Sequence, residues 1–249
     1  MKNVVAARTN MSGHSHAKTV KRVKEAAAAQ RSKIFGKFAN ELTVAAREGA
    51  DPATNPQLRA IIEKAHKVNM PSVNVERAIA RGTGQEGSAL LEVLVEGYGP
   101  GGVALLVQGI TDNKNRTLGE FKQILERKGG KLVGEGQVRW MFERKGVITL
   151  EPERQPLSGE TLELAAIEAG AEETRRHEDG TLDVYAALPA LNALQEALLK
   201  QGLSPNSPTL DWVAKEQVAV SPADQEKLER LFDALDEHEA VQDIYSNVA

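Results

Sequence analysis

The spacing of apolar residues changes along the chain and divides it into a helical part and two mixed parts. Over residues 26–48 apolar side chains recur every three or four positions, which predicts a first long helix. Asn55 and Pro56 supply an N-cap and a first-turn proline for a second helix, which Pro71 interrupts. A short third helix is predicted over 71–82. Three amphipathic helices joined by short loops predict a small bundle.

Strand patterns begin after the Gly-rich segment RGTGQEG at 81–87, which we interpret as a linker. Residues 90–110 contain two apolar runs joined by a Gly/Pro turn, and this pattern predicts a β-hairpin. A helix is expected from about residue 118 to 128, and Thr117 with Glu120 matches a capping box at its start.

The remaining third of the chain alternates strands with helices. From residue 146 to 208 the expected order is strand, helix, strand, strand, helix, strand, which is that of a ferredoxin-like unit. A strand near 210–218, a helix opened by Ser221 and a last strand at 241–245 follow. These late elements are too few for a domain, so we expect them to complete the sheet begun at 88–143.

The expected fold is therefore α+β with three domains: an N-terminal helical bundle followed by two α/β domains, the last inserted into the middle one and ferredoxin-like. The predicted limits are a flexible basic arm at 1–25, a helical nucleic-acid-binding domain at 26–84, a discontinuous α/β domain at 85–144 and 209–249, and a ferredoxin-like domain at 145–208.

Positive and negative residues are unevenly distributed along the chain. Residues 1–84 carry 15 Lys and Arg against 6 Asp and Glu, a net of +9. Residues 85–249 carry 16 against 29, a net of −13, and the two values sum to the overall −4. A basic first third joined to an acidic remainder points to a polyanionic partner.

The basic residues of the first third are the strongest candidates for nucleic-acid contacts. Pairs of cations three or four residues apart share one helix face, and several such faces on a bundle create a positive field that attracts phosphates. A solvated face that only keeps the domain soluble would give the same pattern. The candidates are Lys18, Lys21, Arg22 and Lys24 on the arm and Arg31, Lys33, Lys37, Lys64, Lys67, Arg77 and Arg81 on the helices.

Two loop motifs have the composition of anion sites. TDNKNRT at 111–117 places Lys114 and Arg116 at a helix N-terminus, where backbone N–H groups already favour anions. Asx turns and capping would explain the Asp, Asn and Thr of this loop without any ligand. GYGPGG at 97–102 is followed by a strand instead of a helix, so it predicts a tight hairpin and not a phosphate loop.

Other chemistry finds little support in the sequence. The chain has no cysteine, its five histidines form no metal-ligand pair, and it lacks a Gly-x-Ser-x-Gly nucleophile elbow. We therefore predict no catalytic residue, no metal site, no cofactor and no enzymatic activity. No apolar run reaches the roughly 20 residues of a membrane span, so we expect a cytoplasmic protein without a membrane partner. Trp140 and Trp212 lie among residues of predicted strands and are expected in the core.

Four strings of the sequence are distinctive: MSGHS near the start, the helical segment from KIFGKF to ERAIARGTG, EGYGPGGVALLVQGITDNKNRT, and WMFERKGVI. They resemble the YebC/PmpR family, which includes mitochondrial translational activators. The resemblance covers residues 11–249 and implies three domains, the first of them helical. Members are described as DNA-binding transcriptional regulators or as ribosome-associated factors that help translation through proline-rich stretches.

The chain departs from the family pattern at two places. His16 and Ala17 stand where members usually have Lys-Trp, and Gln30-Arg31-Ser32 replaces Lys-Arg-Gly. The arm has thereby lost a stacking aromatic and some positive charge.

Residues and resemblance together favour a non-enzymatic translation factor that binds ribosomal or transfer RNA and associates with the ribosome. RNA recognition by shape and phosphate contact needs no groove-reading helix, and the bundle shows no helix-turn-helix signature. A DNA-binding transcriptional regulator that recognises duplex DNA is the first alternative. A protein-interaction scaffold is the second.

Overall fold

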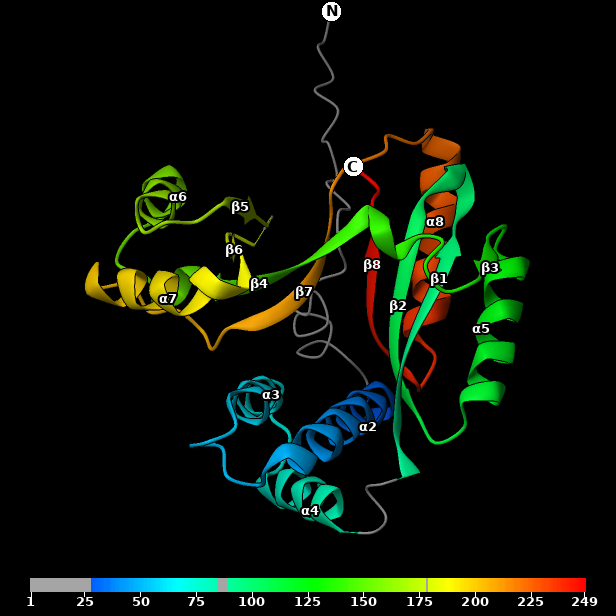
Figure 1. Ribbon diagram of the computed structural model, residues 1–249, viewed down its shortest axis with the longest axis horizontal. Coiled ribbons are helices and arrows are strands. Elements are labelled where there is room, and N and C mark those ends of the chain that lie inside the picture. Colours follow the sequence, from blue (N-terminus) through cyan, green and yellow to red (C-terminus); the bar gives the residue numbers. More distant parts are fainter. Residues whose placement is uncertain (1–27, 85–88, 178) are drawn as a thin grey trace, which may run out of the picture. The chain divides into compact units, whose positions relative to one another are not determined.

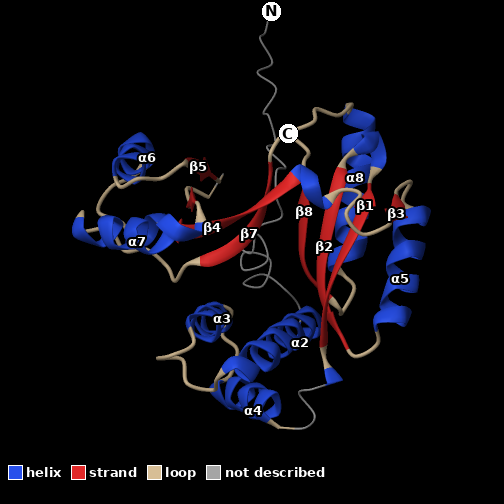
Figure 2. Cartoon of the chain, viewed as in Figure 1, coloured by secondary structure: helices blue, strands red, loops and turns tan. Residues whose placement is uncertain are grey.

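The structure is a computed structural model, and it describes residues 28–84, 89–177 and 179–249 (Figure 1). The fold is α+β, with a helical bundle and two four-stranded sheets (Figure 2). The chain forms two compact units. The first combines Leu91–Phe142 with Ala214–Ala249, and the segment between these two stretches belongs to the second unit. The other contains the helical bundle and Glu143–Val213. The predicted basic arm lies outside the described residues, and the limits of the predicted domains stay a prediction.

The predicted three-helix bundle is confirmed. Its helices are α2 (Ala28–Ala45), extended by a 3-10 turn over Ala46–Glu48, α3 (Pro56–Lys67) and α4 (Ser72–Thr83). Their apolar faces meet in a core that excludes water, formed by Phe38, Leu42, Leu58, Ile61, Ala65, Val68, Met70, Val75 and Ala78. Arg81 lies on a helix, as predicted, and because α4 continues to Thr83 the first residues of the segment 81–87 are helical and not part of a linker.

Asn55 joins two helices of the bundle. As predicted, it is the N-cap of α3, and its side-chain oxygen accepts a hydrogen bond of 3.0 Å from the N–H of Leu58. The amide group of the same side chain donates to the carbonyls of Ala45 and Gly49, both at 2.8 Å. These carbonyls lie at the end of α2, so one buried side chain satisfies groups at both helix ends.

A glycine sets the distance between α2 and α4. A Cβ added at Gly82 would lie 2.3 Å from the carbonyl oxygen of Thr43, closer than atoms can approach. The hydroxyl of Thr43 donates to the carbonyl of Ala78 at 3.1 Å, across the same contact. Gly82 therefore permits the close packing on which the bundle depends.

The first sheet has the order β3-β1-β2-β8, and all of its strand pairs are antiparallel. Its strands are β1 (Leu91–Tyr98), β2 (Ala104–Thr111), β3 (Lys131–Val133) and β8 (Val241–Ser246), and its helices are α5 (Lys114–Arg127) and α8 (Pro222–Asp236). The hairpin of β1 and β2 is the predicted one, and the turn between them holds Gly101 and Gly102 at φ +71° and +75°, values that favour glycine.

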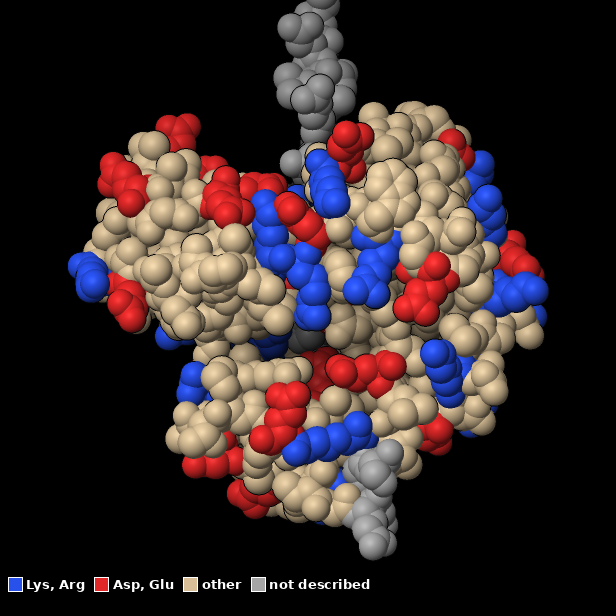
Figure 3. Space-filling model, viewed as in Figure 1, with Lys and Arg blue, Asp and Glu red and all other residues tan. Residues whose placement is uncertain are grey.

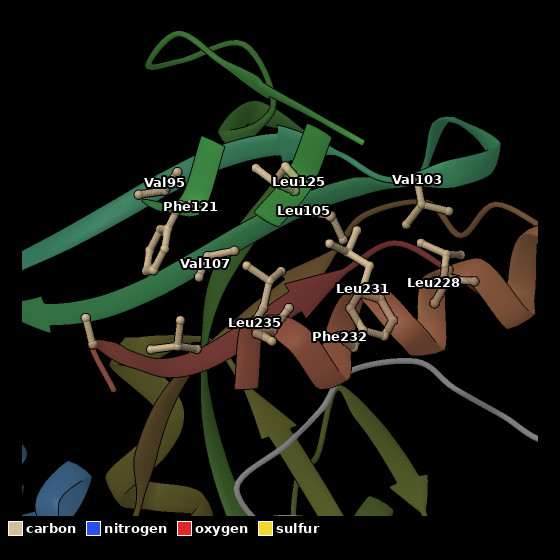
Figure 4. Packing of buried hydrophobic residues seen from close by; sticks show 14 of the residues in the cluster. Val95, Val103, Leu105, Val107, Phe121, Leu125, Leu228, Leu231, Phe232 and Leu235 are labelled. Carbon is tan, nitrogen blue, oxygen red and sulfur yellow. The ribbon is translucent and has the colours of Figure 1, made fainter. Parts of the chain in front are cut away.

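Helices α5 and α8 cover the same face of this sheet (Figure 4). Val95, Leu105 and Val107 point from the strands toward Phe121 of α5 and Phe232 of α8. All five side chains are at least 97% buried. Alternation along β1 then directs the neighbouring residues, Leu94, Glu96 and Tyr98, to the face of the sheet away from these two helices.

The start of α5 differs from the prediction. The helix begins at Lys114 with Asn113 as its N-cap, one turn before the predicted start. Thr117 lies inside the helix, and its buried hydroxyl donates to that of Thr111 at 2.8 Å. The predicted capping box of Thr117 and Glu120 is therefore wrong, because the Asn was the earlier and stronger cap.

The second sheet has the order β5-β6-β4-β7. Its elements follow the chain as β4 (Phe142–Leu150), α6 (Gly159–Glu168), β5 (Glu173–Arg176), β6 (Leu182–Ala186), α7 (Leu191–Lys200) and β7 (Thr209–Ala214), with 3-10 turns at Pro152–Arg154 and Leu188–Ala190. This is the predicted ferredoxin-like βαββαβ unit. The prediction placed β7 in the first sheet, whereas it is the last strand of the second.

Residues 138–142 are also not the strand that their alternation predicted. Arg139–Met141 form a 3-10 turn (η4), and β4 begins only at Phe142. Trp140 consequently lies 65% exposed instead of in the core, while Trp212 is half-buried with the guanidinium of Arg144 5.5 Å from its ring centroid. The prediction for Trp140 was wrong because the turn rotates its side chain out of the strand pattern.

Candidate nucleic-acid interface

Much of the predicted positive charge lies on the arm. Residues 1–27 carry six Lys and Arg against one Glu, a net of +5. Residues 28–84 carry nine against five, a net of +4, which accounts for the rest of the +9. The candidates Lys18, Lys21, Arg22 and Lys24 lie outside the described residues.

Three of the predicted contacts on the bundle present exposed side chains. Arg31 and Lys33 lie in the first half of α2, and Arg77 lies in α4. Lys64, near the end of α3, is partly exposed. Cations on such helix faces reach solvent on flexible stems, so these four can meet a phosphate without breaking a contact of the fold.

The other three predicted contacts on the bundle serve the fold. Lys37 is only 9% exposed. The Nζ of Lys67 lies 2.5 Å from Oε1 of Glu151, a residue that follows β4 in the same unit. Arg81 donates from Nε to the hydroxyl of Thr43 at 3.1 Å and from its guanidinium to Oδ1 of Asn40 at 2.9 Å. These contacts tie α4 to α2, so the pair Arg77 and Arg81 divides into one exposed and one structural residue.

Carboxylates are interspersed with the cations of the bundle. Glu48, Asp51, Glu63 and Glu76 are exposed on it. Figure 3 shows both signs of charge on the viewed face of the helical lobe. The described bundle is thus moderately basic, and the positive electrostatic field of residues 1–84 depends on the cations of the arm as well.

The loop before α5 is built mainly by capping. The Oδ1 of Asn113 accepts from the N–H of Arg116 at 3.1 Å, and the hydroxyl of Thr111 accepts from the N–H of Asn113 at 3.0 Å. The guanidinium of Arg116 forms an exposed ion pair of 2.8 Å with Asp112. Lys114 is exposed. Of the residues that capping and Asx turns were expected to explain, Asn113 is the N-cap, whereas Asp112 forms an ion pair and Thr117 lies inside the helix; binding by Lys114 and Arg116 stays a prediction.

The loop between β3 and β4 was missed as a candidate, and a buried carboxylate organises it. Glu96 of β1 is 3% exposed. Its Oε1 accepts from the N–H of Gly136 at 2.7 Å, and its Oε2 accepts from the N–H groups of Val138 and Arg139 at 2.6 and 2.9 Å. Burial raises the pKa of the Glu96 carboxyl, but these three backbone hydrogen bonds and the charge of Arg139 lower it more, so the pKa lies below its usual value.

The same loop presents an aromatic ring to solvent. Trp140 follows Arg139 in the 3-10 turn, and its Nε1 donates to the carbonyl of Gln137 at 3.0 Å. On the neighbouring strands, the Nζ of Lys131 lies 5.3 Å from the centroid of the Tyr98 ring. The charged Glu96 inside a strand of apolar residues was the sequence signal that could have revealed this loop.

Next to Tyr98 and Lys131 the surface is hollowed. The hollow has a volume of about 320 Å³, and Gly99, Gly102, Gly129 and Gly130 complete its lining. It lies where the β1–β2 turn and the α5–β3 turn meet. The GYGPGG motif thus forms the predicted turn and one wall of a shallow surface depression.

Two histidines, His177 and His238, pair with carboxylates, the second through Nε2 with Oε2 of Glu120 at 3.0 Å. His177 Nε2 lies 2.6 Å from Oδ2 of the buried Asp183, whose other oxygen accepts from the Thr149 hydroxyl at 2.7 Å. This hydrogen bond raises the pKa of His177, against the opposing effect of burial. Among the residues that the structure describes, no group of three or more His, Asp or Glu is arranged to hold a metal ion.

The described helices are also unsuited to a bilayer. In the part of the chain that the structure covers, none combines the length and the apolar character that a membrane crossing requires.

Comparisons with known proteins agree with this architecture. The model of the TACO1/YebC N-terminal domain matches residues 15–85, and the model of the second and third TACO1/YebC domains matches residues 90–248. A probable transcriptional regulatory protein of Fervidobacterium nodosum is 45% identical over 239 residues, which span 95% of this chain and 93% of that protein. One of Caldanaerobacter subterraneus is 42% identical over 240 residues, or 96% and 98% of the two chains.

A solved structure has the same fold. The crystal structure of a conserved hypothetical protein from Aquifex aeolicus superposes with a TM-score of 0.80 at 38% sequence identity, over 89% of this chain and 91% of that one. Family models that together match nearly the whole chain, and relatives of this similarity, lead to one conclusion: the chain belongs to the TACO1/YebC family.

Proposed function

We propose that this protein is a non-enzymatic, nucleic-acid-binding regulator of gene expression that acts in the cytoplasm on RNA and the ribosome. The observation that carries the proposal is the net charge of +9 on residues 1–84 against −13 on the remainder. Arg31, Lys33 and Arg77 place part of that charge on exposed helix faces. Such a region is attracted to phosphates, while the acidic remainder repels polyanions that do not fit.

RNA is favoured over duplex DNA because the sequence of the bundle shows no helix-turn-helix signature. Folded RNA is recognised by shape, by phosphate contacts and by unpaired bases, for which scattered cations suffice. The family resemblance adds a specific role, help with the synthesis of proline-rich stretches. We propose ribosomal or transfer RNA as the target.

Sedimentation of the full chain with ribosomes at moderate salt tests the proposal. The variant Arg31→Glu/Lys33→Glu/Arg77→Glu should leave the ribosomal fractions. A matched control, Lys122→Glu/Lys200→Glu/Arg230→Glu, makes the same change of six charge units on exposed positions of α5, α7 and α8 and should still sediment with ribosomes. Wild-type protein found only in free fractions, in cells that are translating proline runs, would count against the proposal.

The names of the relatives favour a second candidate, a DNA-binding transcriptional regulator. This function predicts that one duplex sequence is bound about a thousandfold more tightly than bulk DNA. That preference should survive added salt, since base contacts release few counterions. Equal affinity for all duplexes, lost as salt is raised, would remove this candidate.

A further inference from the structure

We propose that Trp140 is a stacking platform for an unpaired nucleotide base, with Lys131 and Arg139 as cations for the adjoining phosphates. The proposal rests on the proposed function, because it assumes that the chain binds a single-stranded region of RNA. It adds a contact surface in the first sheet, remote in sequence from the basic third of the chain.

The exposure of Trp140 is the first observation. An indole ring is among the side chains that gain most from burial, yet this one is 65% exposed. Its Nε1 donates to Gln137 within the same turn, so the polar edge is held against the loop. The faces of the ring are then what the side chain offers to a partner.

The rigidity of the loop is the second observation. Three backbone N–H groups, from Gly136, Val138 and Arg139, converge on the buried carboxylate of Glu96 at 2.6 to 2.9 Å. Val138 is fully buried, and the N–H of Met141 closes the turn on its carbonyl at 2.9 Å. Trp140 lies between these anchored residues, so little conformational entropy is lost when a base stacks on it.

The third observation is a second aromatic and cation pair on the same side of the sheet. Glu96 and Tyr98 are two residues apart in β1, so their side chains point to the same face, about 7 Å apart along the strand. Lys131 lies over the Tyr98 ring, and both residues line the Gly-rich hollow. Cations interleaved with aromatic rings characterise surfaces that bind single-stranded nucleic acid.

The surroundings of Trp140 favour a base over a protein partner. A Trp that anchors a protein interface sits at the centre of a larger apolar patch. The compact unit that contains the first sheet exposes two other large apolar side chains among its described residues. They are Leu91, at the start of β1, and Val218, after β7. The other exposed residues of the loop are two glycines and three polar residues, Glu135, Gln137 and Arg139. Glu135 carries the exposed negative charge of the loop, and the buried Glu96 carboxylate adds a second one that is bonded to the loop's backbone N–H groups.

Fluorescence of the full chain tests the platform, because the protein has two tryptophans. In the Trp212→Phe background Trp140 is the sole indole, and stacking should quench its emission when an unstructured RNA oligonucleotide such as oligo(U) is added. An RNA duplex of equal phosphate number should quench far less, since its bases are already stacked. Anisotropy of a labelled copy of each RNA measures binding independently of Trp140.

Three substitutions sharpen the test. Trp140→Leu keeps an apolar side chain without a π face and should weaken oligo(U) binding about tenfold, whereas Trp140→Phe should retain most of it. Lys131→Gln should reduce the slope of log affinity against log salt by about 0.7, as expected for one phosphate contact on a single strand. The melting temperature of each variant separates loss of binding from loss of fold.

The outcomes distinguish this proposal from the function on which it rests. If anisotropy detects no RNA binding to the wild-type chain, the proposed function fails as well. If the oligonucleotide binds but neither quenches Trp140 nor responds to Trp140→Leu, the platform is overturned and the function stands. If Trp140→Leu abolishes sedimentation with ribosomes while oligo(U) binding is unchanged, Trp140 contacts a protein and the platform is also overturned.

Discussion

The helical bundle and the β3–β4 loop differ in what they can offer to a nucleic acid. The bundle has many cations, but its aromatic side chains are covered: Phe35 is half-buried and Phe38 is buried. Among the described residues of the bundle, the large apolar side chain that is exposed is Val73. The loop has few cations but a fixed, exposed Trp140. Charge attracts a polyanion without selecting it, whereas a rigid aromatic ring selects unpaired bases. The comparison suggests that the two regions divide attraction and recognition between them.

The largest effect should follow from reversing the exposed cations of the bundle. In Arg31→Glu/Lys33→Glu/Arg77→Glu the positive field is replaced by a repulsive one, so affinity for RNA should fall at least about a hundredfold at low salt. Filter binding or anisotropy measures this. The matched triple reversal on α5, α7 and α8 should change affinity severalfold at most, and an equal loss in both variants would mean that only net charge matters.

Removal of the Glu96 carboxylate should separate recognition from attraction. Glu96→Gln replaces one charged acceptor oxygen by an amide that donates, which leaves buried N–H groups unpaired and should cost about 2 to 3 kcal/mol of stability. Thermal unfolding measures the cost. Ionic attraction to the bundle should persist in the folded protein, while quenching of Trp140 by oligo(U) should be lost because the loop is no longer fixed. Unchanged stability would contradict the role given to Glu96.

The same carboxylate makes a prediction about acid. The pKa of Glu96 is lowered in the folded protein, so the unfolded chain binds more protons between the folded pKa and the ordinary value near 4.5. The contribution of Glu96 to the free energy of unfolding is present above about pH 4.5 and is lost as the pH falls through the pKa of the folded state. The acid limb of the stability curve should therefore be flatter in Glu96→Gln than in the wild type; parallel limbs would contradict this.

Arg77 and Arg81 provide a smaller test within one helix. Arg77→Gln removes an exposed cation and should lower the salt slope of RNA binding by about 0.7 to 0.9 without changing the melting temperature. Arg81→Gln breaks hydrogen bonds to Thr43 and Asn40 and should lower stability by about 1 kcal/mol while affecting binding less. The reverse assignment of the two effects would refute the division between exposed and structural cations.

The smallest effect concerns His177, far in sequence from both binding regions. Its pKa is raised in the folded protein by the hydrogen bond to Asp183, so its contribution to stability is complete below about pH 6.5. That contribution is lost as pH rises through the folded pKa. Between pH 6 and 8 the wild type should lose stability relative to His177→Gln, by chemical denaturation, while RNA binding at fixed pH stays the same in both. A constant difference in stability would contradict the assigned pKa direction.

The elements of the fold could be predicted where local chemistry was strong. Asn55 and Pro56 marked the start of α3, and glycines marked the β1–β2 turn. Errors arose where a long-range contact overruled the local pattern. Residues 138–142 alternate like a strand, but Glu96, some forty positions earlier, binds their backbone and holds a 3-10 turn. The strand β7 was assigned to the wrong sheet because strand pairing is not encoded in a local pattern.

The candidate site was less accessible to prediction than the fold. The sequence located the cations. It did not reveal that Arg81 donates hydrogen bonds to Thr43 and Asn40, or that Lys67 forms an ion pair with Glu151. These partners are 38 to 84 positions away in the sequence and are brought close only by the fold. The exposure of Trp140 was missed because residues 138–142 were predicted to form a strand, whereas Arg139–Met141 form a 3-10 turn. Periodicity predicts which face a side chain takes only if the element itself is correct.

Crosslinking to RNA in living cells, followed by mapping of the crosslinked peptides, tests the central claim most directly. The account predicts RNA adducts on peptides from residues 1–84 and on the peptide that contains Trp140, with unpaired nucleotides of ribosomal or transfer RNA attached. An absence of RNA adducts on the basic third, or adducts confined to the segment from β4 to β7, would contradict it.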